Sequence, residues 1–220
     1  MTAPPDDLIG ALVRDLRPVT PLRSTRRRLG TWTVMAVTVA VAATALLGLR
    51  RDWASAAGTL SLEGHTVLLV AGAWLAAWGA LRLSVPGDGR ARRVSLVPLA
   101  LLLMWTLWIV TDLAAAAPVV WTLGRGWVCV IRGAAAGMVP GLLLWAMVRR
   151  GQAAEPRAAA VLVVAAGAAL GAVASEWMCP NTRAVHLFVW HVAPVAAAVT
   201  AAFLLARRWR RGSGTLMIVD

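Results

Sequence analysis

The chain has 220 residues, of which 60% are hydrophobic and only 15% are charged, and its formal net charge is +12. A soluble domain is about half apolar and a quarter charged, so this composition excludes an ordinary soluble globular protein and indicates a membrane-embedded one. All 22 basic residues are arginines, and they stand in short clusters between apolar runs. This pattern is typical of topology-setting charge, so we expect no direct nucleic-acid partner.

Residues 6–16 lie within a polar, basic N-terminal segment and predict a short amphipathic helix. Its apolar stripe is formed by Leu8, Ile9, Leu12, Val13 and Leu16, at the spacing of one helix face. Asp15 adds an acidic group to the helix, Arg17 follows it, and Pro18 is expected to end it. So short a helix is marginal alone in water, so we expect it to order on a partner or on the membrane surface.

Six apolar runs follow, near residues 31–49, 65–83, 95–114, 129–148, 157–175 and 185–206. Each approaches the roughly 20 residues with which a helix crosses a bilayer core. The sequence therefore predicts an all-α, polytopic membrane protein. We divide it into an N-terminal cytoplasmic segment (1–29), a six-helix transmembrane domain (30–207) and a short cytoplasmic tail (208–220).

The arginines also predict the orientation, because cytoplasmic loops are enriched in them. With six spans, 17 of the 22 arginines fall in the N-terminal segment, the second and fourth loops and the tail, which all lie on one side. We therefore expect a multi-pass protein of the bacterial inner membrane with both termini in the cytoplasm. The two cysteines, Cys129 and Cys179, are then expected on the periplasmic side.

The fourth and fifth runs predict a tightly packed helical hairpin. Small residues recur at intervals of four at Gly133, Gly137, Gly141, Gly167 and Gly171. Such residues let two membrane helices approach closely. The two arms of the hairpin are of similar length, so Cys129 and Cys179 are expected at matching depth. A disulfide needs Cα atoms about 4.4–6.8 Å apart, which this hairpin could supply.

Two charges accompany the thiols within the predicted helices. Arg132 lies three residues inward of Cys129, and Glu176 lies three residues inward of Cys179. A charge inside a membrane segment is a functional hypothesis by default. We therefore expect Arg132 and Glu176 to form an ion pair that tunes the thiols, since a nearby arginine favours the reactive thiolate. The alternatives are that Arg132 reaches the headgroups and that Glu176 lies in water.

The three histidines, His65, His186 and His191, are also expected near the outer side. Thiolate and imidazole together suit soft metals. The close ligand pairs of zinc sites are absent, however, so the histidines are treated as packed residues, and no metal ligand or cofactor is assigned. The sequence also has no Cys-x-x-Cys, phosphate loop or Gly-x-Ser-x-Gly motif, so we expect no enzyme activity.

The order of these features resembles the NrsF family of bacterial membrane anti-sigma factors, which have six predicted transmembrane helices. The similar segments are residues 8–23, with Asp15-Leu16-Arg17-Pro18 at their centre, the loop 82–87, and one cysteine in each of Trp127-Val128-Cys129 and Cys179-Pro180. The resemblance spans nearly the whole chain.

The resemblance implies an extracytoplasmic-function (ECF) sigma factor as protein partner, held inactive at the membrane. It further implies release under heavy-metal or oxidative stress through Cys129 and Cys179. The N-terminal stripe, with Asp15, Arg17 and Pro18, is then the expected sigma-binding element. A transporter or channel for a metal or small solute, and a membrane thiol oxidoreductase, are the alternatives. The identity of the sigma factor, the natural inducer, the resting thiol state, the oligomeric state and the mode of release (reversible or by proteolysis) stay open.

Overall fold

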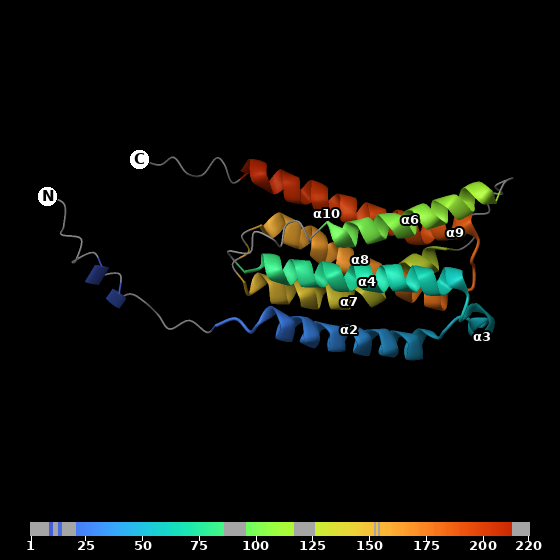
Figure 1. Cartoon of the computed structure of the whole chain (residues 1–220), viewed down its shortest axis with the longest axis horizontal. Helices are drawn as coiled ribbons and strands as arrows, with labels where there is room; N and C mark the ends of the chain where they lie inside the picture. The colour runs from blue at the N-terminus through green and yellow to red at the C-terminus, as the bar shows by residue number, and fades with distance from the viewer. Residues whose placement is uncertain are drawn as a thin grey trace.

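The computed structural model describes residues 9–10, 13–14, 21–85, 96–116, 126–151, 153 and 155–212, with side chains as far as residue 208. Within these ranges the chain forms helices and no strand (Figure 1). The all-α fold class predicted from the sequence is therefore confirmed.

In the part of the chain that the structure describes, six stretches of helix are long and apolar enough to cross a membrane. The elements are α2 (Thr25–Leu47), α3 (Trp53–Ala56), α4 (Leu60–Leu83), α6 (Val97–Ala115), α7 (Trp127–Arg149), α8 (Pro156–Met178), α9 (Ala184–Leu187), the π-helical turn η1 (Phe188–Val192) and α10 (Ala193–Gly212). The sixth span consists of α9, η1 and most of α10 in one run. Each predicted apolar run corresponds to one of these spans. Helix α2 begins earlier than predicted because the Ser24 side chain caps it by accepting from the N–H of Arg27.

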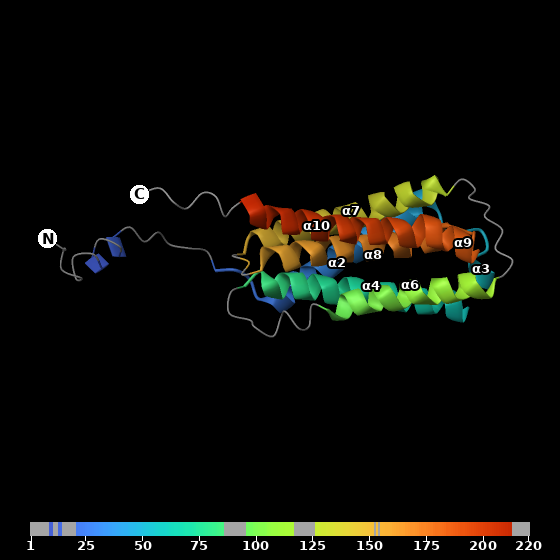
Figure 2. The ribbon, with the colours of Figure 1, turned by 90° about the horizontal axis from the view of Figure 1, so that it is seen from above.

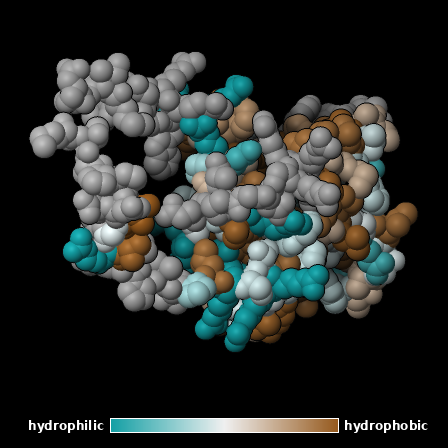
Figure 3. All heavy atoms as spheres, turned by 60° about the vertical axis from the view of Figure 1, so that its left-hand side comes forward, coloured by the Kyte–Doolittle hydropathy of each residue, from teal (hydrophilic) through white to brown (hydrophobic). Residues whose placement is uncertain are grey.

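The long helices run alternately up and down the bundle, so their ends gather at two opposite ends of the molecule (Figures 1 and 2). Helix α2 begins, and α10 ends, at what we call the arginine end, which carries Arg28, Arg82, Arg149 and Arg157. Helix α7 begins, and α8 ends, at the opposite end, which we call the cysteine end. Figure 3 looks toward the arginine end and shows hydrophilic side chains there beside largely hydrophobic flanks.

Helix α8 forms the centre of the bundle and packs against α4, α7 and α10. Its side chains are mainly alanine, glycine and valine, and most of them are buried. The predicted hairpin of α7 and α8 is present, and its glycines are in contact. A Cβ atom on Gly137 would lie 2.2 Å from the carbonyl oxygen of Gly167, so only glycine permits this approach of the two backbones.

Two side chains of α2, Arg28 and Trp32, make hydrogen bonds to other described helices of the bundle. At the arginine end the buried Arg28 donates to the hydroxyl of Ser84, after α4, and to the carbonyl oxygen of Met147 in α7. Further along, the indole N–H of Trp32 donates to the carbonyl oxygen of Pro140 at 2.9 Å. The start of α2 is therefore fixed to the end of α7.

Only part of the predicted sigma-binding helix is described. Residues 9–10 and 13–14 are helical, and the side chains of Ile9 and Val13 are more than half exposed. The remaining residues of that prediction lie outside the described residues; these are Leu8, Leu12, Asp15, Leu16, Arg17 and Pro18. The division of the chain into cytoplasmic segment, transmembrane domain and tail stays a prediction.

Candidate functional site

The two cysteines meet at the cysteine end of the α7–α8 hairpin. Cys129 lies in the first turn of α7, and Cys179 follows the last residue of α8. Ser175 holds the two elements together, because its hydroxyl donates to the carbonyl oxygen of Cys129 at 2.9 Å and its own carbonyl accepts from the N–H of Cys179. Both thiols are free, and Cys179 is buried.

Two histidines complete this cluster. The Nε2 atom of His186 lies 3.2 Å from Sγ of Cys179 and 3.7 Å from Sγ of Cys129. The His191 ring stands at an angle to that of His186, with 5.6 Å between the ring centroids. One ligand atom from each of Cys129, Cys179, His186 and His191 lies within 4.8 Å of the other three. We call these four residues the Cys2His2 cluster.

The π-helical turn explains how His186 and His191 reach the same place. In an α-helix, residues five apart are turned about 140° from each other, at 3.6 residues per turn. Between these histidines the chain instead forms η1, in which the N–H of Ala193 donates to the carbonyl of Phe188, five residues earlier. This wider turn brings residues five apart onto one side of the helix.

The histidines are the residues that the sequence interpretation missed. It treated them as packed bystanders, because the close ligand pairs of zinc sites are absent from the sequence. The available signal is Pro194, which has no N–H for the carbonyl of Trp190 and whose ring crowds that carbonyl. A local widening of the helix relieves this conflict, and π-turns are frequent at functional sites. The third histidine, His65, lies elsewhere, in α4.

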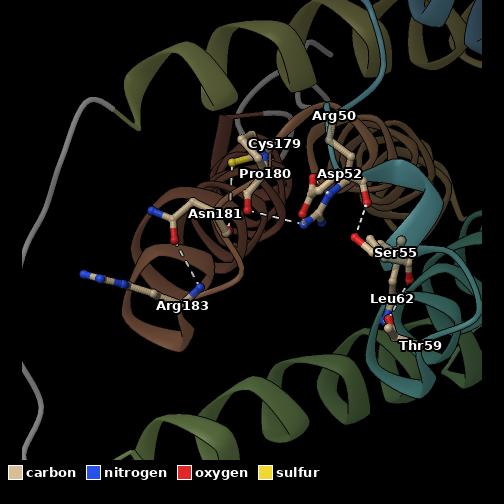
Figure 4. A network of polar contacts seen from close by, with 10 residues as sticks. Arg50, Asp52, Ser55, Thr59, Leu62, Cys179, Pro180, Asn181 and Arg183 are labelled. Atoms are coloured by element: carbon tan, nitrogen blue, oxygen red, sulfur yellow. Dashed lines mark hydrogen bonds and ion pairs between the residues drawn. The ribbon is translucent and has the colours of Figure 1, made fainter.

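A clamp from the loop after α2 holds the chain around Cys179 (Figure 4). The main-chain N–H of Arg50 donates to the carbonyl oxygen of Trp177 at 3.0 Å, and its guanidinium donates to the carbonyl oxygen of Pro180. Asp52 fixes this guanidinium by a bidentate ion pair, with distances of 2.7 and 2.6 Å. The hydrogen bonds from Arg50 lower the pKa of Asp52, and those to Asp52 raise the pKa of Arg50.

The environment of Cys179 favours its thiolate. A hydrogen bond from Cys129 is the main cause that lowers the pKa of the Cys179 thiol, and the nearby His191 lowers it further, whereas burial acts in the opposite direction. The thiolate is the form that attacks disulfides and oxidants and that binds soft metals. The cluster is therefore suited to thiol oxidation or to soft-metal binding.

Glu176 has partners other than the predicted Arg132. Its carboxylate accepts from the indole N–H of Trp105 at 3.1 Å and lies 3.4 Å from Nδ1 of His65. Glu176, His65 and Trp105 are all nearly fully buried. Helix α8 is rotated so that this carboxylate faces α4 and α6, whereas Arg132 lies on α7. Glu176 is therefore part of a polar triad that joins three helices. The tuning of the thiols by Arg132 and Glu176 stays a prediction.

Comparison with known proteins identifies one family. The profile described as NrsF, negative regulator of sigma F, matches residues 12–211, which is most of the chain. No curated protein and no solved structure matches the chain.

Proposed function

Because the chain belongs to the NrsF family of negative regulators of sigma F, we propose that it is an inner-membrane anti-sigma factor for an ECF sigma factor. It sequesters the sigma factor through its N-terminal segment and releases it when Cys129 and Cys179 react with heavy metals or oxidants. The observation that carries this proposal is the family match over residues 12–211 of a chain whose two cysteines lie together at one end of the bundle. It is a non-enzymatic regulator.

The distribution of arginine supports an orientation with both termini in the cytoplasm. The arginine end then faces the cytoplasm, where a sigma factor is available. The Cys2His2 cluster lies on the periplasmic side, an oxidising compartment in which disulfides can form and persist. Sensing and sequestration are thereby separated by the thickness of the membrane.

The N-terminal segment is suited to bind the sigma factor as a helix in a groove. Ile9 and Val13 are exposed on a helical backbone and have the spacing of neighbours on one face. The acidic Asp15 suits the basic surface expected of a DNA-binding partner. Arg17 and Pro18 follow between this helix and the membrane.

Helix α7 supplies a continuous connection between the two ends. It has 23 residues, which corresponds to roughly 34 Å at 1.5 Å per residue. Cys129 lies in its first turn, and the carbonyl oxygen of Met147, in its last turn, accepts from Arg28. A shift of α7 caused by chemistry at Cys129 is transmitted to Arg28 and so to the start of α2. The N-terminal segment precedes α2 directly, so its position depends on this contact.

Copurification tests the partner assignment. The full-length protein, extracted in detergent, should carry a stoichiometric ECF sigma factor, and deletion of residues 1–23 should abolish this complex and give constitutive sigma-dependent transcription. Continued repression by a truncated protein that is inserted at normal levels would refute the docking assignment. A transporter would instead move its solute in proteoliposomes regardless of this deletion.

Replacement of both cysteines by serine tests the sensor. The Cys129→Ser/Cys179→Ser protein should repress in the absence of stress and fail to respond to cadmium or to an oxidant. The truncated protein is the matched control, since it should lose repression with its cysteines intact. Unchanged induction in the double variant would contradict the sensor role. Alkylation of the thiols in unstressed cells shows whether the resting state is the dithiol or the disulfide.

A further inference from the structure

Among the residues that the structure describes, neither ring nitrogen of His191 has a partner with hydrogen-bond geometry, although its side chain is only 2% exposed and lies close enough to Cys179 to lower the pKa of that thiol. Burying a polar group without a partner is energetically unfavourable, so such groups are rare in the absence of a ligand. A ring nitrogen of His191 nevertheless lies within 4.8 Å of a ligand atom of each of Cys129, Cys179 and His186. The position of His191 therefore points to a ligand that the four residues share.

The separations between the donors fit a small cation. Ligand atoms around a tetrahedral zinc ion lie roughly 3.3–3.8 Å apart, as follows from bonds of about 2.0–2.3 Å. The distances from Nε2 of His186 to the two sulfur atoms are 3.2 and 3.7 Å, close to this range, and the whole set lies within 4.8 Å. A modest contraction would bring all four donors to bonding distance.

We propose that Cys129, Cys179, His186 and His191 form a four-coordinate binding site for a soft or borderline divalent cation of the zinc or cadmium type. Two thiolates balance the charge of such an ion, and two neutral imidazoles complete a tetrahedral set. Sulfur and imidazole donors discriminate against magnesium and calcium, which prefer oxygen. The π-turn η1 is the structural device that makes His191 the fourth ligand.

A polar cavity supplies a route to the site. It has a volume of about 410 Å³ and lies at the cysteine end, between the start of α4 and the segment that follows α8. Cys179 forms part of its wall, together with the ion-paired Arg50 and Asp52, Glu176 and Asn181.

An ion in the Cys2His2 cluster would join elements that are otherwise separate in sequence. Cys129 belongs to α7, Cys179 follows α8, and the histidines belong to α9 and η1. Binding would therefore restrain three parts of the bundle together. A role for this restraint in signalling rests on the proposed function. The four-ligand site extends the proposed cysteine sensor by naming its full ligand set. The binding itself does not depend on a sigma factor.

Titration of the purified, reduced, full-length protein in detergent with cadmium chloride alone tests the site. We expect one high-affinity ion per chain, with cadmium–thiolate charge-transfer absorption. His186→Ala and His191→Ala should each weaken affinity by about 100-fold or more, because loss of an outer-shell partner alone typically costs 10- to 100-fold. His65→Ala is the matched control, since it removes a buried histidine that lies outside the cluster, and its affinity should equal that of the wild type.

Wild-type affinity in His186→Ala and in His191→Ala would overturn the proposal and would leave binding to the two thiols alone. Absence of saturable binding by the wild-type protein would overturn it as well. If either variant fails to fold, the cobalt(II) spectrum of the wild-type protein decides the question. Intense ligand-field bands of a tetrahedral site, with histidine nitrogens seen by X-ray absorption, support the proposal, and a spectrum with sulfur and oxygen ligands only contradicts it.

These measurements distinguish failure of the four-ligand site from failure of the proposed regulatory function. Cadmium binding is measured without a sigma factor, whereas sequestration is measured by copurification and by transcription. A chain that binds cadmium at four ligands but does not repress would contradict only the regulatory role. A chain that represses and responds through its cysteines, but binds cadmium equally well without His191, would contradict only the four-ligand site.

Discussion

The guanidinium of Arg28 donates a hydrogen bond to the hydroxyl of Ser84 at 3.0 Å, across a separation of 56 residues in sequence. The same side chain donates to the carbonyl oxygen of Met147. Arg28 therefore holds the start of α2 against the ends of α4 and α7. Since the N-terminal segment precedes α2, the contact is where a movement of α7 would reach the proposed sigma-binding segment.

Replacement of Arg28 by alanine should disconnect the two ends of the molecule. Loss of the buried hydrogen bonds should destabilise the attachment of α2 by about 1–3 kcal/mol. We expect Arg28→Ala to change sigma-dependent transcription while cadmium affinity at the cysteine end stays as in the wild type. Arg27→Ala is the matched control, since it removes the same charge from an exposed neighbour. Equal transcription in the two variants would contradict the role of Arg28.

The contact between Gly137 and Gly167 predicts unequal effects of the same substitution at two glycines of α7. A Cβ on Gly137 would lie 2.2 Å from the carbonyl oxygen of Gly167, whereas a Cβ on Gly141 would be at 3.6 Å from the nearest atom. Gly137→Ala should push α7 away from α8 and reduce oxidative cross-linking of Cys129 to Cys179. Gly141→Ala should cross-link as the wild type does. Non-reducing mass spectrometry after mild oxidation measures both.

Substitutions of Glu176 should affect stability according to whether the new side chain can accept the hydrogen bond from Trp105. Glu176→Ala should lower the free energy of unfolding by about 1–3 kcal/mol, because it leaves the indole N–H of Trp105 buried without its acceptor. Glu176→Gln should cost less, since the amide oxygen can still accept. Thermal unfolding in detergent measures both, with the exposed Glu63→Gln as the control. An alanine variant as stable as the wild type would contradict the importance of the triad.

The Arg50–Asp52 ion pair predicts a pH dependence of the clamp around Cys179. The pKa of Asp52 is lowered in the folded protein by its hydrogen bonds with Arg50. A lowered pKa means that the ion pair stabilises the loop fully above the ordinary pKa of 3.8, and that this contribution is lost as the pH falls through the folded-state pKa.

Hydrogen exchange at the amide of Arg50, which donates to Trp177, measures this dependence. Protection should be greater in the wild type than in Asp52→Asn at neutral pH, and the difference should vanish in acid. Asp112→Asn, at an exposed aspartate of α6, should behave as the wild type does. A difference that persists unchanged in acid would show that the ion pair is not its cause.

The sequence alone determined the number and order of the spans, because each of the six helices needs an apolar run of about 20 residues to cross a bilayer. It also determined the α7–α8 hairpin, since glycines at intervals of four, such as Gly133 and Gly137, permit close contact of two helices. The common location of Cys129 and Cys179 follows from the equal arms of that hairpin. The spans, the hairpin and the shared location of the cysteines all follow from the spacing of residues along the chain, which can be read from the sequence.

Only the tertiary structure decided which side chains face one another. Because of the rotation of α8 about its axis, the carboxylate of Glu176 contacts His65 and Trp105 instead of the predicted Arg132. The π-turn before Pro194 brings His191 close to His186 and the thiols, whereas an uninterrupted α-helix would turn residues five apart about 140° from each other. Helix rotation and local widening depend on packing against neighbours, so apolar periodicity does not determine them, and the composition of the Cys2His2 cluster follows from the fold.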